Sequence, residues 1–262
     1  MALRIGLITD IHSGPDMDTR LGTAAPSFLE KFAARMSKKF RPDLIVDLGD
    51  RINDVNVSED IDRIQKVREK LESIGVPVFF LYGNHDLINI DKEKMRKLLG
   101  KKSDYEAIDY RGYHFILLDS QDPTFGGVGG TISEEQLSWL ESDLKKCSNQ
   151  VIIFSHHPLD EQTFASHWFF GTHPEFALAK NREHARTLFA QSKKVKAIFN
   201  GHMHWNNVET IDGIPYVTIE SLVDGGLTDG HPCGCFTELV LEKDGDFSLN
   251  VRGDLPMSFS YP

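Results

Sequence analysis

Histidine, aspartate and asparagine recur in five short blocks of this chain, each following an apolar run. The blocks are Asp10-Ile11-His12, Gly49-Asp50, Gly83-Asn84-His85-Asp86, His156-His157-Pro158 and Gly201-His202-Met203-His204. Imidazole, carboxylate and amide oxygen together suit borderline first-row metal ions such as Zn, Mn or Fe. The donors are too many for one tetrahedral centre, but they suit two ions about 3.5–4 Å apart that share a carboxylate. Each block alone is a weak signal, because short Asp-x-His or His-His-Pro stretches also form ordinary turns, whereas five together indicate a site.

The apolar runs before these blocks are predicted strands, and amphipathic segments between them are predicted helices. The strands are 3–9, 43–50, 77–83, 113–118, 151–155 and 195–199, and the helices are 26–40, 58–75 with Ser58 as its cap, and 133–146 with a Ser133 and Gln136 capping box. Strand–helix–strand order predicts parallel pairing in a layered α/β fold. The carboxyl ends of parallel strands gather functional groups, so the five blocks are expected to converge, with Gly83 making a sharp turn.

The C-terminal third has a different pattern. Residues 207–219 and 235–252 read as antiparallel strands, with Asp212-Gly213 and Asp244-Gly245 as turns. We expect 1–262 to be a single domain, with C-terminal strands and tail from about residue 235. The last segment, 255–262, is expected to be a tail lying on the surface or on a neighbouring subunit.

Composition limits the function further. The chain has 262 residues, 40% of them hydrophobic and 26% charged, with a formal net charge of −10, which argues against nucleic acid as a partner. Three cysteines are too few for a disulfide framework and fit a reducing compartment. No run approaches the roughly 18 apolar residues of a membrane span, and the N-terminus lacks the features of a signal peptide. We therefore expect a cytoplasmic protein with no membrane contact.

The five blocks, in this order, resemble the calcineurin-like metallophosphoesterases over about residues 3 to 220. The resemblance implies a four-layer αββα sandwich of two facing mixed β-sheets flanked by helices. It implies two divalent or trivalent metal ions, with Mn, Fe or Zn as candidates. One ion would be held by Asp10, His12 and His204, the other by Asn84, His156 and His202, and Asp50 would bridge them.

The same resemblance gives His85 and Asp86 catalytic roles. His85 would lie near the phosphate as a general acid or transition-state stabiliser, and Asp86 would orient it. The implied reaction is attack of a metal-bridging hydroxide on phosphorus, since metal binding lowers the pKa of water to about 7 on zinc. His156 is chosen over His157 as the ligand because it directly follows the strand; whether His157 contacts substrate is left open.

Within the family, "GDRIND", "GNHD" and His156-His157-Pro158 look more like the bacterial phosphodiesterase branch than the protein phosphatases. That branch includes class III cyclic-nucleotide phosphodiesterases and glycerophosphodiesterases. We therefore expect a small phosphate diester, such as a cyclic nucleotide or glycerophosphodiester, as substrate. Phosphomonoester or nucleotide diphosphate hydrolysis, a non-catalytic scaffold and a homo-oligomer remain alternatives, and the acidic balance disfavours a nuclease.

Several further segments have two interpretations each. Aromatics and histidines of 160–176 (His167, Trp168, Phe169, Phe170 and His173) could form a pocket wall. The favoured interpretation is a loop or short helix whose aromatics fill core or a dimer contact, because aromatics are usually packed. "FGGVGG" (125–130) is expected to be a flexible lid or turn, and "HPCGC" (231–235) a loop beside the site and not a zinc site. Asn53 and Asp54 could support the ligands or simply shape a turn. His114, His184 and His231 are assigned no role.

Overall fold

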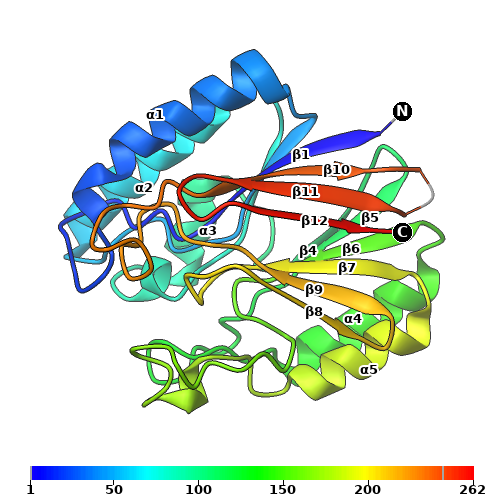
Figure 1. The fold of residues 1–262 in the computed structure, drawn as a ribbon. Helices are drawn as coiled ribbons and strands as arrows, with labels where there is room; N and C mark the ends of the chain where they lie inside the picture. Colours follow the sequence, from blue (N-terminus) through cyan, green and yellow to red (C-terminus); the bar gives the residue numbers. More distant parts are fainter. Residues whose placement is uncertain (1, 244) are drawn as a thin grey trace.

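Two mixed β-sheets face each other at the centre of the molecule. In the computed structural model, which describes residues 2–243 and 245–262, each sheet has six strands (Figure 1). The first sheet runs β12 (Met257–Tyr261), β11 (Phe247–Arg252), β10 (Phe236–Leu241), β1 (Leu3–Ile8), β2 (Leu44–Asp47) and β3 (Val78–Phe80). The second runs β4 (Glu106–Tyr110), β5 (Tyr113–Leu117), β6 (Gln150–Phe154), β7 (Val195–Asn200), β9 (Ile214–Thr218) and β8 (Asn207–Ile211).

The strands that precede the five blocks are parallel neighbours. β1 pairs with β2 and β2 with β3 in one sheet, while β6 pairs with β7 in the other, all in parallel. Their carboxyl ends therefore lie at the same end of each sheet, as the sequence predicts. The antiparallel pairs β4–β5, β8–β9 and β10–β11–β12 complete the sheets at their margins.

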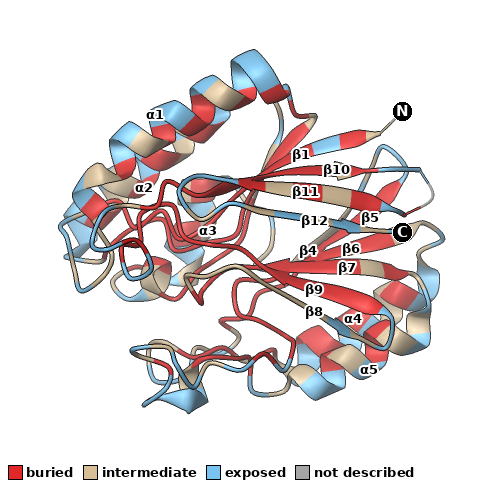
Figure 2. Cartoon of the chain, viewed as in Figure 1, coloured by how far each residue is buried: buried red, intermediate tan, exposed pale blue. Residues whose placement is uncertain are grey.

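Alternation along each strand explains the four layers. On β1, Leu3, Ile5 and Leu7 belong to the core between the sheets, whereas Ile8 belongs to the core under the helices. The helices α1 (Ala25–Arg35), α2 (Val57–Glu72) and α3 (Lys92–Leu99) cover the outer face of the first sheet, and α4 (Glu134–Lys146) and α5 (Arg182–Ser192) cover the second. Figure 1 shows this order of layers, and Figure 2 shows the buried strands between the helices. The predicted αββα sandwich is confirmed.

Several boundaries differ from the sequence prediction for local reasons. α2 begins one residue before Ser58, because the Asn56 side chain accepts hydrogen bonds from the backbone N of Ser58 and Glu59 and is the true cap. The predicted helix 26–40 is α-helical only to Arg35 and continues as a π-helical turn, Met36–Phe40. The α4 cap is as predicted, with Ser133 accepting from the Gln136 backbone N.

Other elements were missed or misread. The predicted tail 255–262 instead contains β12, which pairs antiparallel with β11 and extends the first sheet. α3, α5 and β4 had no counterpart in the prediction. Asp212 and Gly213 form the predicted hairpin turn, both with positive φ. Asp244 of the other predicted turn lies outside the described residues, although β10 and β11 on either side of it are antiparallel as expected.

Across the described ranges, no helix is long and apolar enough to cross a membrane. Cys147, Cys233 and Cys235 are all free. The predicted cytoplasmic location stays a prediction.

Candidate metal centre

Side chains from the predicted blocks meet where the parallel strands of both sheets end. Asp10 and His12 follow β1, Asp50 follows β2, Asn84 follows β3, His156 follows β6, and His202 and His204 follow β7. All are buried except His204, which is nearly so. Both sheets thus contribute residues to one cluster, because the carboxyl ends of their parallel strands meet there.

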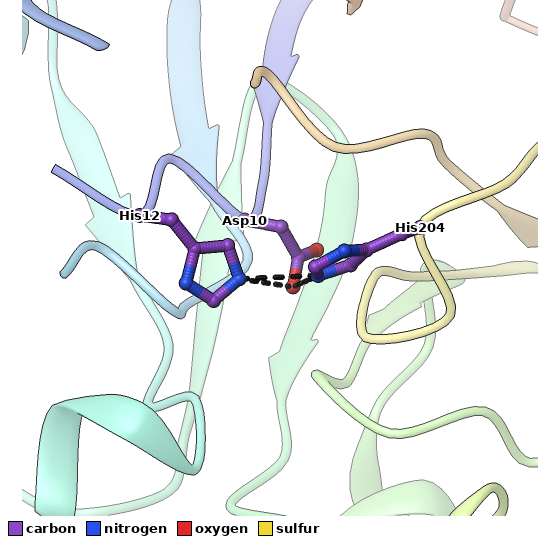
Figure 3. A group of neighbouring side chains, drawn as sticks. All are labelled: Asp10, His12 and His204. Carbon is purple, nitrogen blue, oxygen red and sulfur yellow. Dashed lines mark hydrogen bonds and ion pairs between the residues drawn. The ribbon is translucent and has the colours of Figure 1, made fainter. Parts of the chain in front are cut away.

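One half of the cluster consists of Asp10, His12 and His204. Their side chains point toward one another (Figure 3), with Asp10 Oδ1 3.2 Å from His204 Nε2 and 3.8 Å from His12 Nε2. The two Nε2 atoms are 3.1 Å apart. Three potential ligand atoms therefore surround one point within 4.8 Å of one another.

The other half contains Asn84, His156 and His202, and Asp50 lies between the two. Asp50 Oδ2 is 3.8 Å from His12 Nε2 and 3.4 Å from His156 Nε2. Asn84 Oδ1 is 3.3 Å from His156 Nε2, and ligand atoms of Asp50, His156 and His202 all lie within 4.8 Å of one another. A single carboxylate that faces histidines of both halves is the geometry expected of a bridging ligand.

The second ring nitrogen of each histidine has a fixed partner outside the cluster. His12 Nδ1 lies 3.3 Å from Ile52 O, His156 Nδ1 2.9 Å from Leu48 O, His202 Nε2 3.0 Å from Phe176 O, and His204 Nδ1 2.7 Å from Asp224 Oδ2. Because these oxygens can only accept, each facing nitrogen carries the proton and the inward nitrogen is free to bind a cation. The donor set fits two metal ions.

The backbone of the cluster is held in unfavourable conformations. Asp10, His12, Asp50, His202 and His204 all have positive φ, between 46° and 71°. Non-glycine residues in this region cost of order 1–3 kcal/mol each, and such residues concentrate at functional sites. The surrounding fold therefore imposes these positions against local preference.

Two motif glycines make room for the carboxylates. A Cβ on Gly83 would lie 2.1 Å from Asp50 Oδ1, and one on Gly201 would lie 2.4 Å from Asp10 Oδ2. Gly83 does not have a positive φ, so the position needs glycine for the close approach of Asp50 and not for a left-handed backbone.

Burial and the charges of neighbouring side chains shift the pKa values of the aspartates and histidines in the cluster. Burial opposes ionisation of Asp10, but His204 and His12 hold its pKa well below its usual value. Against the effect of burial, Asp50 raises the pKa of His156 to about 9, and Asp10 raises that of His204 to about 10. The carboxylates thus attract positive charge into a buried space, a charge that divalent cations would supply.

The structure corrects the predicted partner of His85. Asp54 Oδ1 lies 2.6 Å from His85 Nδ1, so Asp54 and not Asp86 orients the ring. The Asp86 carboxylate instead accepts hydrogen bonds from the backbone N of Gly83, Asp50 and Arg51 and from the Arg51 guanidinium. Asp86 therefore holds together the two loops that carry Asp50 and Asn84.

A cavity of about 220 Å³ opens onto the cluster. Its lining includes Asp50, Asn84, His85, His202 and His204 together with residues of two loops, Asp18, Thr19, Arg20, Val128, His167, Trp168, Phe169 and Phe170. Both interpretations of 160–176 hold in part, because Phe170 is buried in an aromatic cluster with Phe169 packed against it, while Trp168 is 55% exposed and lines the cavity with them. His173 is exposed and stacks on Phe169 outside the cavity lining.

His157 is buried and is absent from the cavity lining. Its Nε2 donates to Val128 O, and its Nδ1 lies 2.9 Å from Ser120 Oγ. The ring packs 4.1 Å from that of His202. His157 thus fastens the glycine-rich segment 125–130 beside the cluster.

Three further residues complete this site, and two of them have no local signal in the sequence. Asp224 bonds His204 Nδ1 and accepts from Thr19 Oγ1 at 2.7 Å. Arg20 Nη1 lies 2.5 Å from His85 Nε2. Asp54 follows its block and is expected from the sequence either to support the ligands or to shape a turn, whereas Arg20 and Asp224 lie in loops that no motif marks. His114, given no role, lies between Asp109 and Asp143 on β5, apart from the cavity lining.

Comparisons with known proteins agree with this geometry. The family model of calcineurin-like phosphoesterases matches residues 3–206. A probable cyclic nucleotide phosphodiesterase from Fibrobacter succinogenes is 30% identical over 82% of this chain and 78% of that protein. A manganese-dependent ADP-ribose/CDP-alcohol diphosphatase from Oryza sativa subsp. japonica is 24% identical over 84% and 83%. The structure of a dimetal phosphatase from Danio rerio has the same fold, with a TM-score of 0.79, 20% identity and 99% of each chain covered.

Proposed function

This chain belongs to the calcineurin-like phosphoesterase family of metal-dependent phosphoric-ester hydrolases, and we propose that it cleaves small phosphate diesters at the cluster described above. Cyclic nucleotides and glycerophosphodiesters are the leading substrate candidates. The observation that carries the proposal is Asp50, whose Oδ2 faces His12 in one half of the cluster and His156 in the other. No single-metal arrangement requires that placement.

The proposed ligands are Asp10, His12 and His204 for one ion and Asn84, His156 and His202 for the other, with Asp50 shared. When bound, two such ions neutralise phosphoryl oxygens and lower the pKa of water, which is the chemistry phosphoryl transfer chiefly needs. Asn84 contributes a neutral amide oxygen, so its ion keeps more of its positive charge than a carboxylate ligand would leave.

His85 is the proposed residue beside the leaving group. Its backbone N donates to Asp50 Oδ1 at 2.8 Å, which fixes the ring next to the cluster, and Asp54 holds Nδ1. The other nitrogen, Nε2, faces Arg20 on the cavity side. Because Arg20 can only donate, Nε2 accepts in this arrangement and must take up a proton before it acts as a general acid, a role typically worth about 10²–10⁴-fold. Asp86 acts indirectly, by holding the loops of Asp50 and Asn84.

Nucleotide diphosphate hydrolysis is the second candidate, since a relative over most of the chain is named an ADP-ribose/CDP-alcohol diphosphatase. A phosphomonoester would use the same cluster. The scaffold alternative is disfavoured because all seven proposed ligand positions hold residues able to bind metal.

Metal content and substrate preference test the proposal together. The purified protein is analysed for metal and assayed with bis(p-nitrophenyl) phosphate and p-nitrophenyl phosphate in added Mn²⁺, beside Asp50→Ala and the surface control Asp62→Asn. We expect close to two metal equivalents and faster diester cleavage in the parent and control, and loss of both in Asp50→Ala.

Other outcomes would redirect the assignment. Faster monoester cleavage would make the protein a phosphatase. Two bound metals without cleavage of either ester would favour the diphosphate or scaffold alternative. No metal bound would contradict the proposed site.

A further inference from the structure

Arg20 lies on a segment that is fixed to the far side of the site. Leu21 N donates to Val223 O at 3.2 Å, and Gly225 N donates to Thr19 O at 2.8 Å. Thr19 Oγ1 also donates to Asp224, which in turn holds His204. The backbone that carries Arg20 is thus braced on both sides, and its side chain has a defined direction.

The Arg20 guanidinium lines the cavity, and its ion-pair partner in the described chain is an exposed carboxylate. Among the described residues that line the cavity, Arg20 is the one arginine or lysine. Its one ion pair in the described chain is with Asp18, at 3.4 Å, and the Asp18 side chain is 56% exposed while that of Arg20 is 12% exposed. An exposed carboxylate at this distance offsets little of the charge. The cation is therefore largely available to a ligand.

The remaining contact of Arg20 is with the imidazole beside the cluster. Nη1 lies 2.5 Å from His85 Nε2, which places the guanidinium next to the proposed leaving-group residue. A phosphate diester carries one negative charge, which the proposed metal centre already accommodates. A guanidinium fork beside it suits the two oxygens of another phosphate.

The lining of the same cavity also includes a group of aromatic side chains. Trp168 is 55% exposed, and Phe169, Phe170 and His167 lie next to it. A flat ring is the chemical group that such a surface binds, by stacking. The cavity lining therefore combines aromatic side chains, residues of the cluster and a cation.

We propose that Arg20 is a specificity-determining residue that binds a second phosphate adjacent to the one cleaved, so that the preferred substrates are nucleosides linked through a diphosphate. This inference rests on the proposed metal centre and hydrolase function, and it favours the second substrate candidate over cyclic nucleotides and glycerophosphodiesters, which carry a single phosphate. In the reaction, water oxygen joins one phosphorus, the bridging oxygen leaves with the other, and two monoesters and a proton result. Arg20 holds the leaving phosphate and takes no proton.

Arg20→Gln and Arg20→Lys test the assignment, with Arg111→Gln as control. Arg111 lies in the β4–β5 turn, paired with Asp43 and at the opposite end of β5 from the site. Hydrolysis of ADP-ribose is compared with that of bis(p-nitrophenyl) phosphate. Binding of α,β-methylene-ADP is compared with that of AMP by calorimetry on the metal-loaded protein, and circular dichroism checks folding.

We expect Arg20→Gln to weaken ADP-ribose turnover (kcat/KM) and α,β-methylene-ADP binding about 10- to 100-fold, the usual effect of losing a charge-assisted contact. The diester and AMP should change less than about threefold, Arg20→Lys should fall between, and the control should match the parent. Equal losses on every substrate and ligand would overturn the proposal, because Arg20 would then serve the cleaved phosphate or His85. Absence of any hydrolysis by the parent would refute the proposed function instead, and calorimetry would still decide the role of Arg20.

Discussion

Replacing Arg51 with methionine should destabilise the protein more than any surface charge change. The Arg51 side chain is fully buried, with Nε 2.7 Å from Asp47, Nη1 2.6 Å from Asp86 and Nη2 donating to Leu81 O at 2.7 Å. It is the cation between two buried carboxylates. Methionine has similar length and apolar character, so the change removes charge with little loss of volume.

The expected loss follows from those contacts. Removing one partner of a buried ion pair costs about 3–5 kcal/mol, because the remaining charge is left uncompensated. Burial already raises the pKa of Asp47 to about 6, although Arg51 opposes that shift. Without Arg51 the folded-state pKa rises further above the unfolded value, so the folded state binds a proton that the unfolded state releases. The loss in unfolding free energy should therefore be largest near pH 8 and smaller near pH 5.

Equilibrium urea unfolding measures this loss for Arg51→Met and the parent at both pH values, in excess EDTA so that metal binding does not add to stability. Lys97→Met is the matched control, since Lys97 pairs with Glu93 one helical turn away on the surface and should contribute about 0.3–0.5 kcal/mol. A loss below about 1 kcal/mol at pH 8, or one that grows toward acid pH, would refute the reasoning.

Three further predictions concern other parts of the molecule. His85→Ala should retain both metal equivalents while turnover falls about 10²–10⁴-fold, whereas Asn84→Ala should lose metal as well as turnover. Metal analysis together with steady-state rates distinguishes the two variants. Loss of metal in His85→Ala would contradict the division of roles between the two residues. Asp224→Asn should weaken metal binding about 10- to 100-fold, because Asp224 holds the ring of the proposed ligand His204. Competition with a chelator measures the affinity. An unchanged affinity would show that the Asp224–His204 hydrogen bond does not support metal binding. The two carboxylates that flank His114 raise its pKa despite burial, so its stabilising effect is complete below pH 6.5 and is lost as pH rises through the higher folded-state value. Unfolding at pH 5.5 and 8.5 should show this pH dependence in the parent but not in His114→Gln.

The blocks and their strands could be predicted from the sequence because each carries local information. An apolar run of strand length followed by Asp10 or Asp50 predicts where a strand ends, and parallel pairing then brings those ends to one edge. β12 was missed although Met257, Phe259 and Tyr261 alternate with serines as in a strand, because a run of five residues is a weak signal and gains its partner only when β11 is in place. The start of α2 was misplaced because Asn56 and Ser58 are both good caps, and only the backbone decides which one accepts the hydrogen bonds.

The sequence by itself determined which residues could bind metal, because imidazole and carboxylate chemistry belongs to the side chains and their order along the chain. The tertiary structure decided which carboxylate serves which group. Asp86 directly follows His85 in the sequence, yet its carboxylate accepts from the backbone of the Asp50 loop. Asp54 follows a different block, four positions after Asp50, and it is the residue that bonds the His85 ring. Arg20 and Asp224 became part of the site only because separate loops close over it, and contacts between distant loops leave no local pattern in a sequence.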